Sequence, residues 1–140
     1  MGLIKQNMDF EIILLNVNYG YVGFDKDSLE DSEMVVLDDY KMDGFNEDLV
    51  SISLTRKVHY EPEMIFNISV TLQIVYNINK DSKQKLTKDN LVKELESKKK
   101  ILLSPLVSKA VLLIANITNT DDDFNIITLP FLLETEEKYN

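Results

Sequence analysis

The chain has no cysteine, no tryptophan and one histidine, and these absences exclude much side-chain chemistry. Without cysteine it has no disulfide framework, no thiolate metal site and no cysteine nucleophile. One histidine cannot build a multi-histidine metal site. His59 lies beside Lys57 on a stretch of alternating polarity, so we expect a solvent-facing strand residue rather than a general base.

Glycine is also scarce, with four residues and no glycine-rich loop that would cradle phosphate groups. Three consecutive aspartates at residues 121–123 lack the turn glycine and the closing glutamate of a calcium-binding loop. We therefore interpret them as a solvated turn. The sequence predicts no enzymatic activity, no cofactor and no bound metal.

The charged residues are segregated along the chain. The formal net charge is −9; residues 25–48 carry ten acids and two lysines, whereas residues 80–100 carry eight lysines and four acids. Such a division either steers a charged partner or reflects a solvated loop and a solvated helix. The acidic total argues against nucleic acid as a ligand, because phosphate binding needs a dominant basic surface.

Long uninterrupted apolar runs are missing as well. The first residues have no secretory pattern, because Asp9 and Glu11 interrupt their apolar stretch. Residues 101–117 are too short for a membrane span and contain Pro105 and Lys109. We expect a cytoplasmic protein without membrane insertion, folded as one domain over residues 1–140.

Apolar and polar residues alternate along several stretches, which is typical of strands with one buried face. In residues 10–24 the apolar face changes part-way, which predicts a bulge or a strand buried on both sides. Residues 33–39 predict a short strand. Residues 50–60 and 66–78 flank Pro62, which predicts an antiparallel hairpin because proline interrupts the ladder.

The last third of the chain has a helical period instead. Thr87 is expected to cap one helix, and Ser104 a second helix with Pro105 in its first turn. The second helix is apolar almost all round, so we expect it to be buried on two sides. These elements predict an α+β fold, in which an antiparallel β-sheet of about four strands packs against C-terminal helices in two layers.

The predicted sheet and helix have more apolar surface than they need to cover each other. The surplus indicates oligomerisation or a hydrophobic groove, unless the first strand and the final segment fill the gap. Three aromatic residues beside glycines end the first strand: Tyr19, Tyr21 and Phe24. Either they line a groove that binds exposed apolar side chains, or they belong to sheet packing or a dimer seam.

Two stretches near the end of the chain resemble the SecB-type export chaperones. "LLSPLVSKAVLLI" is similar to the start of that family's long helix, and "ITLPFLL" to the Leu-Pro-Pro segment that follows it. The matching positions are Leu103, Pro105, Leu129 and Pro130. Leu106 replaces an aromatic residue after the first proline, and Phe131 stands in place of the second proline of the Leu-Pro-Pro segment.

Members of that family are cytoplasmic dimers of dimers that hold unfolded precursor proteins in hydrophobic grooves, without a cofactor, and pass them to the translocation ATPase. The resemblance implies an ATP-independent holding chaperone that forms a homodimer or homotetramer. The expected peptide-binding residues are Tyr19, Tyr21, Phe24, Leu106 and Phe131. The alternative is a non-enzymatic structural or adaptor subunit whose apolar surface is used in oligomer assembly.

Overall fold

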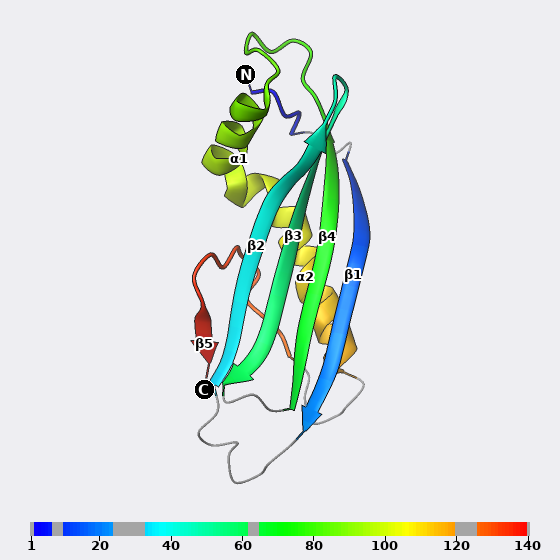
Figure 1. Cartoon of the computed structure of the whole chain (residues 1–140), viewed down its shortest axis with the longest axis vertical. Helices are drawn as coiled ribbons and strands as arrows, with labels where there is room; N and C mark the ends of the chain where they lie inside the picture. Colours follow the sequence, from blue (N-terminus) through cyan, green and yellow to red (C-terminus); the bar gives the residue numbers. More distant parts are fainter. Residues whose placement is uncertain (1, 7–9, 24–32, 62–64, 120–125, 140) are drawn as a thin grey trace.

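The structure, a computed structural model, describes residues 2–6, 10–23, 33–61, 65–119 and 126–139. These residues form one antiparallel sheet with the strand order β1-β4-β3-β2-β5, and two helices. Figure 1 shows both helices on the same side of the sheet. The elements are β1 Phe10–Gly23, β2 Glu33–Phe45, β3 Leu49–Glu61, β4 Ile65–Asn77, α1 Lys88–Leu102, α2 Ser104–Thr118 and β5 Glu137–Tyr139. The predicted α+β architecture is confirmed.

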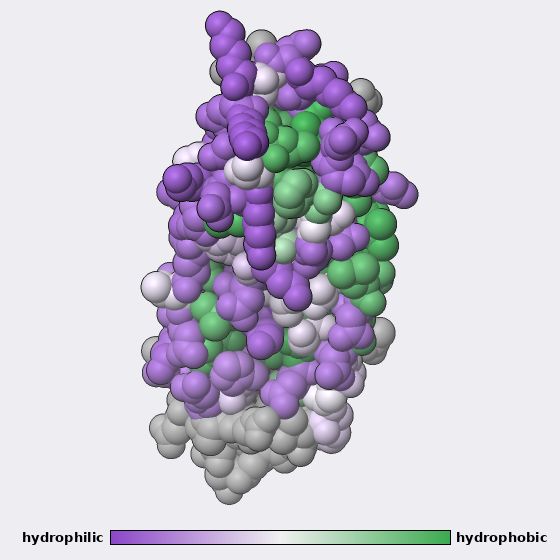
Figure 2. Space-filling model, turned by 45° about the horizontal axis from the view of Figure 1, so that its top comes forward, coloured by the Kyte–Doolittle hydropathy of each residue, from purple (hydrophilic) through white to green (hydrophobic). Residues whose placement is uncertain are grey.

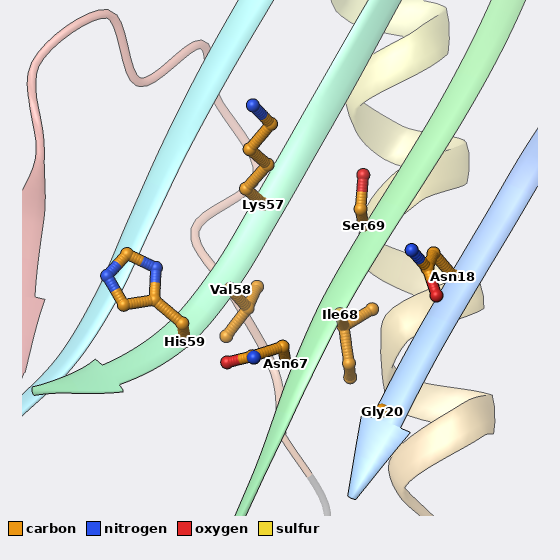
Figure 3. Close-up of a pocket in the computed structure, with 8 residues that line it drawn as sticks. All are labelled: Asn18, Gly20, Lys57, Val58, His59, Asn67, Ile68 and Ser69. Carbon is orange, nitrogen blue, oxygen red and sulfur yellow. The ribbon is translucent and has the colours of Figure 1, made fainter. Parts of the chain in front are cut away.

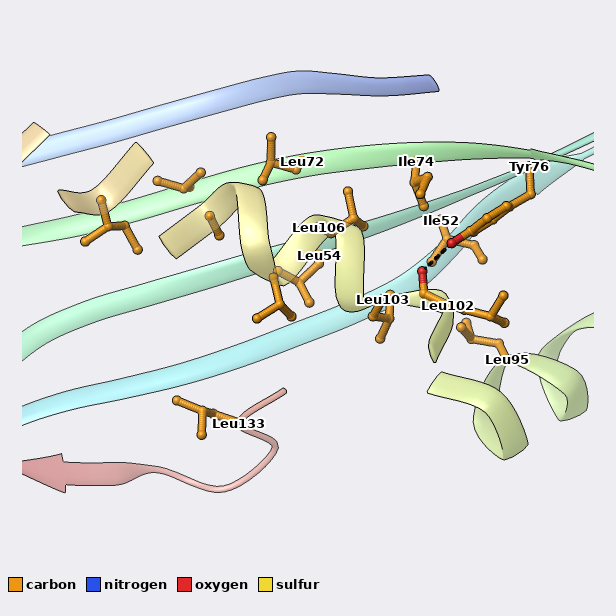
Figure 4. Close-up of a cluster of buried hydrophobic side chains, with 14 of the residues drawn as sticks. Ile52, Leu54, Leu72, Ile74, Tyr76, Leu95, Leu102, Leu103, Leu106 and Leu133 are labelled. Carbon is orange, nitrogen blue, oxygen red and sulfur yellow. Dashed lines mark hydrogen bonds between the residues drawn. The ribbon is translucent and has the colours of Figure 1, made fainter. Parts of the chain in front are cut away.

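The core lies between the sheet and the helices, because alternate residues of β3 and β4 point toward them. Ile52 and Leu54 of β3 pair with Ile74 and Leu72 of β4, and all four side chains are completely buried. Figure 4 shows these residues together with Leu106 of α2. The predicted hairpin of these two strands is confirmed.

The second strand is longer than the sequence predicted. β2 continues to Phe45 instead of ending near residue 39, and it pairs with β3 along this length. Tyr40 and Met42 keep the alternation, since both are partly buried against the core. The charged residues Asp39, Lys41 and Asp43 alternate with them and lie on the other face, where their charge hid the apolar period.

The two helices follow each other with a bend of 50°. Thr87 caps α1 as predicted, because its Oγ1 accepts a hydrogen bond from Asn90 N at 3.2 Å. The prediction that Ser104 caps α2 was wrong. Leu103, with helical φ −92° and ψ −10°, ends α1 and begins α2, so the chain never leaves helical geometry long enough for a serine cap.

The second helix is buried on one side only, which corrects the prediction of two buried sides. Leu106, Val107, Ala110 and Ile114 are buried, whereas Leu112 is 59% exposed. The helix packs on β3 and β4. The side chains of the edge strand β1 are less well covered than those of β3 and β4, and several of them stay exposed.

A final segment, residues 126–133, lies against the other half of the sheet and is called the strap below. It is held by Arg56 of β3, which is completely buried and forms a bidentate ion pair with Asp38 of β2, with Nε–Oδ1 and Nη2–Oδ2 distances of 2.7 Å. The remaining guanidinium N–H groups of Arg56 donate to strap atoms: Thr128 Oγ1, Leu129 O and Phe131 O.

Among the described residues, neither helix alone has the length and hydropathy of a membrane span. Only α1 and α2 taken together, across their bend, reach that length and composition.

Candidate functional site

The edge strand β1 carries a row of apolar side chains on the helix side of the sheet. Residues that are directly paired in an antiparallel ladder share a face. The side chains paired with the buried residues of β4 therefore point toward the helix layer: Phe10, Ile12, Leu14, Val17, Tyr19 and Tyr21.

A bulge keeps this row on one face. Leu14 pairs with Leu72 and Asn16 with Thr71, which leaves Leu15 as an additional residue without its own partner position. The extra residue reverses the phase of the alternation, so Val17 lies on the same face as Leu14. The bulge predicted from the change of apolar face is confirmed.

The row is only partly covered: Ile12 packs against the core, and the other side chains of the row are exposed. Tyr21 is 71% exposed and Leu15 is 50% exposed. The ring of Tyr19 packs on the ring of Phe66, with 5.8 Å between the two ring centroids. We call all exposed apolar side chains of β1 the β1 surface. It includes the exposed members of the row, the bulge residue Leu15, and Ile13 on the opposite face: Phe10, Ile13, Leu14, Leu15, Val17, Tyr19 and Tyr21. In Figure 2 hydrophobic atoms gather at the margin where β1 lies, beside a largely hydrophilic sheet face.

The backbone of β1 is also open to a partner. Within the described part of the chain, this 14-residue strand pairs with β4 alone, so the N–H and C=O groups of its outer edge face away from the sheet. Such an edge is a template for an additional strand. The β1 surface thus combines exposed apolar side chains with a free backbone edge.

The structure places the predicted site residues in different surroundings. Tyr19 and Tyr21 belong to the β1 surface, and Phe24 lies outside the described residues. The prediction that Leu106 binds a peptide is corrected, because its side chain is completely buried between α2 and the sheet. Phe131 is 56% exposed on the strap, which Arg56 attaches to β3. Since β4 lies between β3 and β1, Phe131 is separated from the β1 surface.

The aliphatic residues of the β1 surface were missed by the sequence analysis. Ile13, Leu14, Leu15 and Val17 were taken for ordinary strand residues because only the aromatic residues were singled out. The unbroken apolar run at residues 12–15 was the available signal, since a strand with one buried face rarely needs it.

The opposite face of the sheet has a polar hollow, drawn in Figure 3. Its lining includes Asn18, Lys57, His59 and Ser69, and Gly20 leaves one side open because it has no side chain. His59 Nε2 lies 3.5 Å from Glu61 Oε1. These groups offer hydrogen bonds, but no cluster of metal-ligating side chains occurs among the residues that the structure describes.

A sheet of four long antiparallel strands with two consecutive helices on one face defines the SecB-like fold. The chain is similar to the solved structure of the Mycobacterium tuberculosis Rv1957 SecB-like chaperone in complex with a ChAD peptide from the Rv1956 HigA1 antitoxin. The TM-score is 0.65 at 9% sequence identity, over 85% of this chain and 82% of that one. This likeness confirms the predicted fold.

A further similar structure is a Streptococcus agalactiae protein of unknown function, with a TM-score of 0.40, 15% identity and coverage of 86% of this chain and 97% of that one. No protein-family model matches the chain. No curated protein sequence matches it either.

Proposed function

We propose that the protein is an ATP-independent holding chaperone that binds unfolded or precursor polypeptides along β1. One observation carries the proposal: a 14-residue edge strand presents seven exposed apolar side chains next to an unpaired backbone edge within the described structure. The similar Mycobacterium tuberculosis chaperone, whose structure contains a bound peptide, supports a role in polypeptide binding.

The two components of the β1 surface suit a client of undefined sequence. Burial of an apolar side chain stabilises a complex by about 1.5–3 kcal/mol when it is complete, and every unfolded chain exposes such side chains. Backbone hydrogen bonds from an added strand do not depend on sequence. A partner that offers both is an extended, unfolded polypeptide.

The second candidate function is an adaptor or structural subunit, in which the β1 surface is covered by a second copy of the chain. The same exposed edge favours it, because long apolar edge strands are usually covered in native proteins. In that assembly two β1 strands would pair across a twofold axis and form a homodimer or, by further contacts, a homotetramer.

The experiment that tests the proposal is aggregation of a chemically unfolded, slow-folding protein, diluted with and without stoichiometric amounts of the chain and without nucleotide. We expect suppression by the wild type and its loss in the Leu15→Ser/Tyr21→Ser variant. The matched control is Leu112→Ser/Ile127→Ser, which removes two exposed apolar residues elsewhere and should suppress as the wild type does.

A folded wild type that does not suppress aggregation would refute the holding function. A hydrophobic dye separates the adaptor from it: dye fluorescence should rise for an open β1 surface and stay at background for a β1 surface covered by a second copy.

A further inference from the structure

Residues 2–5 are bound to the rest of the protein as an extended peptide would be. Ile4 forms an isolated antiparallel bridge with Ile78, which directly follows β4. Lys5 N donates to Asn77 O at 2.9 Å, and Asn79 N donates to Leu3 O at 2.7 Å. The segment thus adds a minimal strand to β4 without becoming a full strand of the sheet.

A buried carboxylate binds the backbone of the same segment. Leu3 N donates to Glu94 Oε1 and Ile4 N donates to Glu94 Oε2, both at 2.6 Å. Glu94 lies on α1 and is 7% exposed. A carboxylate in this position requires N–H donors, since a buried acceptor without partners costs about 1–3 kcal/mol or more.

The side chains of the segment are recognised as well. Leu3 and Ile4 are only 2% and 4% exposed and belong to the main hydrophobic core. A Cβ at Gly2 would overlap the Glu94 carboxylate, so a larger residue would have to displace the group that binds Leu3 N and Ile4 N. The complementary ligand is therefore an extended chain with glycine followed by two apolar residues.

We propose that Glu94 and the end of β4 form a second polypeptide-recognition site, which residues 2–5 occupy and a client segment of the type Gly-apolar-apolar displaces. This inference rests on the proposed holding function and adds a site with a defined sequence preference. The contacts with residues 2–5 come mainly from backbone groups, which any extended chain offers. Because Glu94 needs donors, the site exchanges one occupant for another instead of standing empty.

The absence of cysteine makes the exchange testable with one engineered cross-link. Ile4 and Ile78 form a non-hydrogen-bonded antiparallel pair, whose Cα separation of about 4.5 Å lies within the range for a disulfide. The Ile4→Cys/Ile78→Cys variant holds residues 2–5 in place when it is oxidised and releases them when it is reduced. The reduced protein is the matched control because its sequence is the same.

The probe is an acetylated, fluorescent peptide of sequence Gly-Leu-Ile-Lys-Gln, and its binding is measured by anisotropy. We expect binding to the reduced variant and at least tenfold weaker binding to the oxidised one. A Val-Leu-Ile-Lys-Gln peptide should bind the reduced form more weakly than the glycine peptide does, because its valine displaces the Glu94 carboxylate. Equal binding to both forms would overturn the proposal, as would oxidation that links two copies in place of one chain.

A second measurement uses the wild type and does not depend on the folding of a variant. Excess peptide should raise hydrogen exchange at the amides of Leu3 and Ile4, and no change in exchange would overturn the proposal. A wild type that exchanges the peptide but suppresses no aggregation would refute the holding function and leave this site standing. Suppression of aggregation without peptide exchange would support the holding function and refute this second site.

Discussion

Arg56 and Asp38 form a charged pair inside the hydrophobic core. They are directly paired on neighbouring strands, and both side chains are completely buried. Two further hydrogen bonds complete the contact. Leu133 N donates to Asp38 Oδ2, and Asp38 N donates to Leu133 O, both at 2.8 Å. The pair therefore attaches the strap to the sheet.

We predict that Arg56→Met lowers the free energy of unfolding by about 3–5 kcal/mol, because it leaves the Asp38 carboxylate buried without its partner. The double variant Arg56→Met/Asp38→Leu should recover much of this loss, since both charges are removed. Urea denaturation of the single and double variants measures the coupling. Hydrogen exchange in residues 126–133 should rise in both, because each loses the groups that bind the strap; a double variant as unstable as Arg56→Met would contradict the prediction.

Tyrosines with raised pKa values should make the protein sensitive to alkaline pH. Burial raises the pKa of Tyr76, whose Oη donates to Leu102 O at 2.7 Å, to about 12 (Figure 4). Burial and a hydrogen bond donated to Glu96 raise the pKa of Tyr40 to about 12. Each neutral phenol thus contributes stability that is fully present below the ordinary pKa of 10.0 and is lost as the pH rises through about 12.

The expected result is a free energy of unfolding that falls between about pH 10 and pH 12, measured by urea denaturation at each pH. Tyr76→Phe should flatten this dependence and cost about 1 kcal/mol at neutral pH through the lost hydrogen bond. Tyr60→Phe is a comparison at another tyrosine whose pKa burial raises. This variant should lose only the contribution of Tyr60 to the pH dependence and keep those of Tyr40 and Tyr76. A Tyr76→Phe profile parallel to that of the wild type would show that Tyr76 does not titrate as described.

At the scale of elements, the bulge in β1 can be tested by deleting the residue that forms it. Without Leu15, Leu14 and Asn16 become consecutive residues opposite Leu72 and Thr71, and every other side chain of β1 keeps its face. We predict that this deletion changes the free energy of unfolding by less than about 1 kcal/mol. Deletion of Gln73, in the regular strand β4, is the matched control.

Removing Gln73 should be more damaging, because β4 has no extra residue to absorb the loss. A one-residue shift then moves the buried side chains on one side of the deletion to the opposite face of the sheet. Denaturant unfolding of both deletion variants measures the difference, and cross-strand contacts from nuclear magnetic resonance spectra report the register. Equal loss of stability in the two variants would mean that the bulge is itself required for the fold.

At the scale of the whole molecule, local periodicity predicted the order of the elements, the hairpin and the bulge. It also contained an unused signal: Asp38 and Arg56 both fall on the core-facing phase of neighbouring strands, where charges occur only in pairs. The contact between Glu94 and Leu3 joins residues 91 positions apart, and the sequence has no pattern that indicates it. Leu106 was misplaced for a related reason, because the apolar circumference of α2 does not show which side meets the sheet.

The last prediction concerns competition between a second copy and a client for the β1 surface. Both would use the same exposed apolar side chains and the same backbone edge, so binding of one excludes the other. Any oligomer formed through β1 should therefore dissociate as unfolded client is added, by mass action. Sedimentation velocity with a fluorescent client measures both species at once, and the Leu15→Ser/Tyr21→Ser variant should be monomeric and should not bind the client. Client that binds to an oligomer of unchanged size would contradict the prediction, because assembly and client binding would then use separate surfaces.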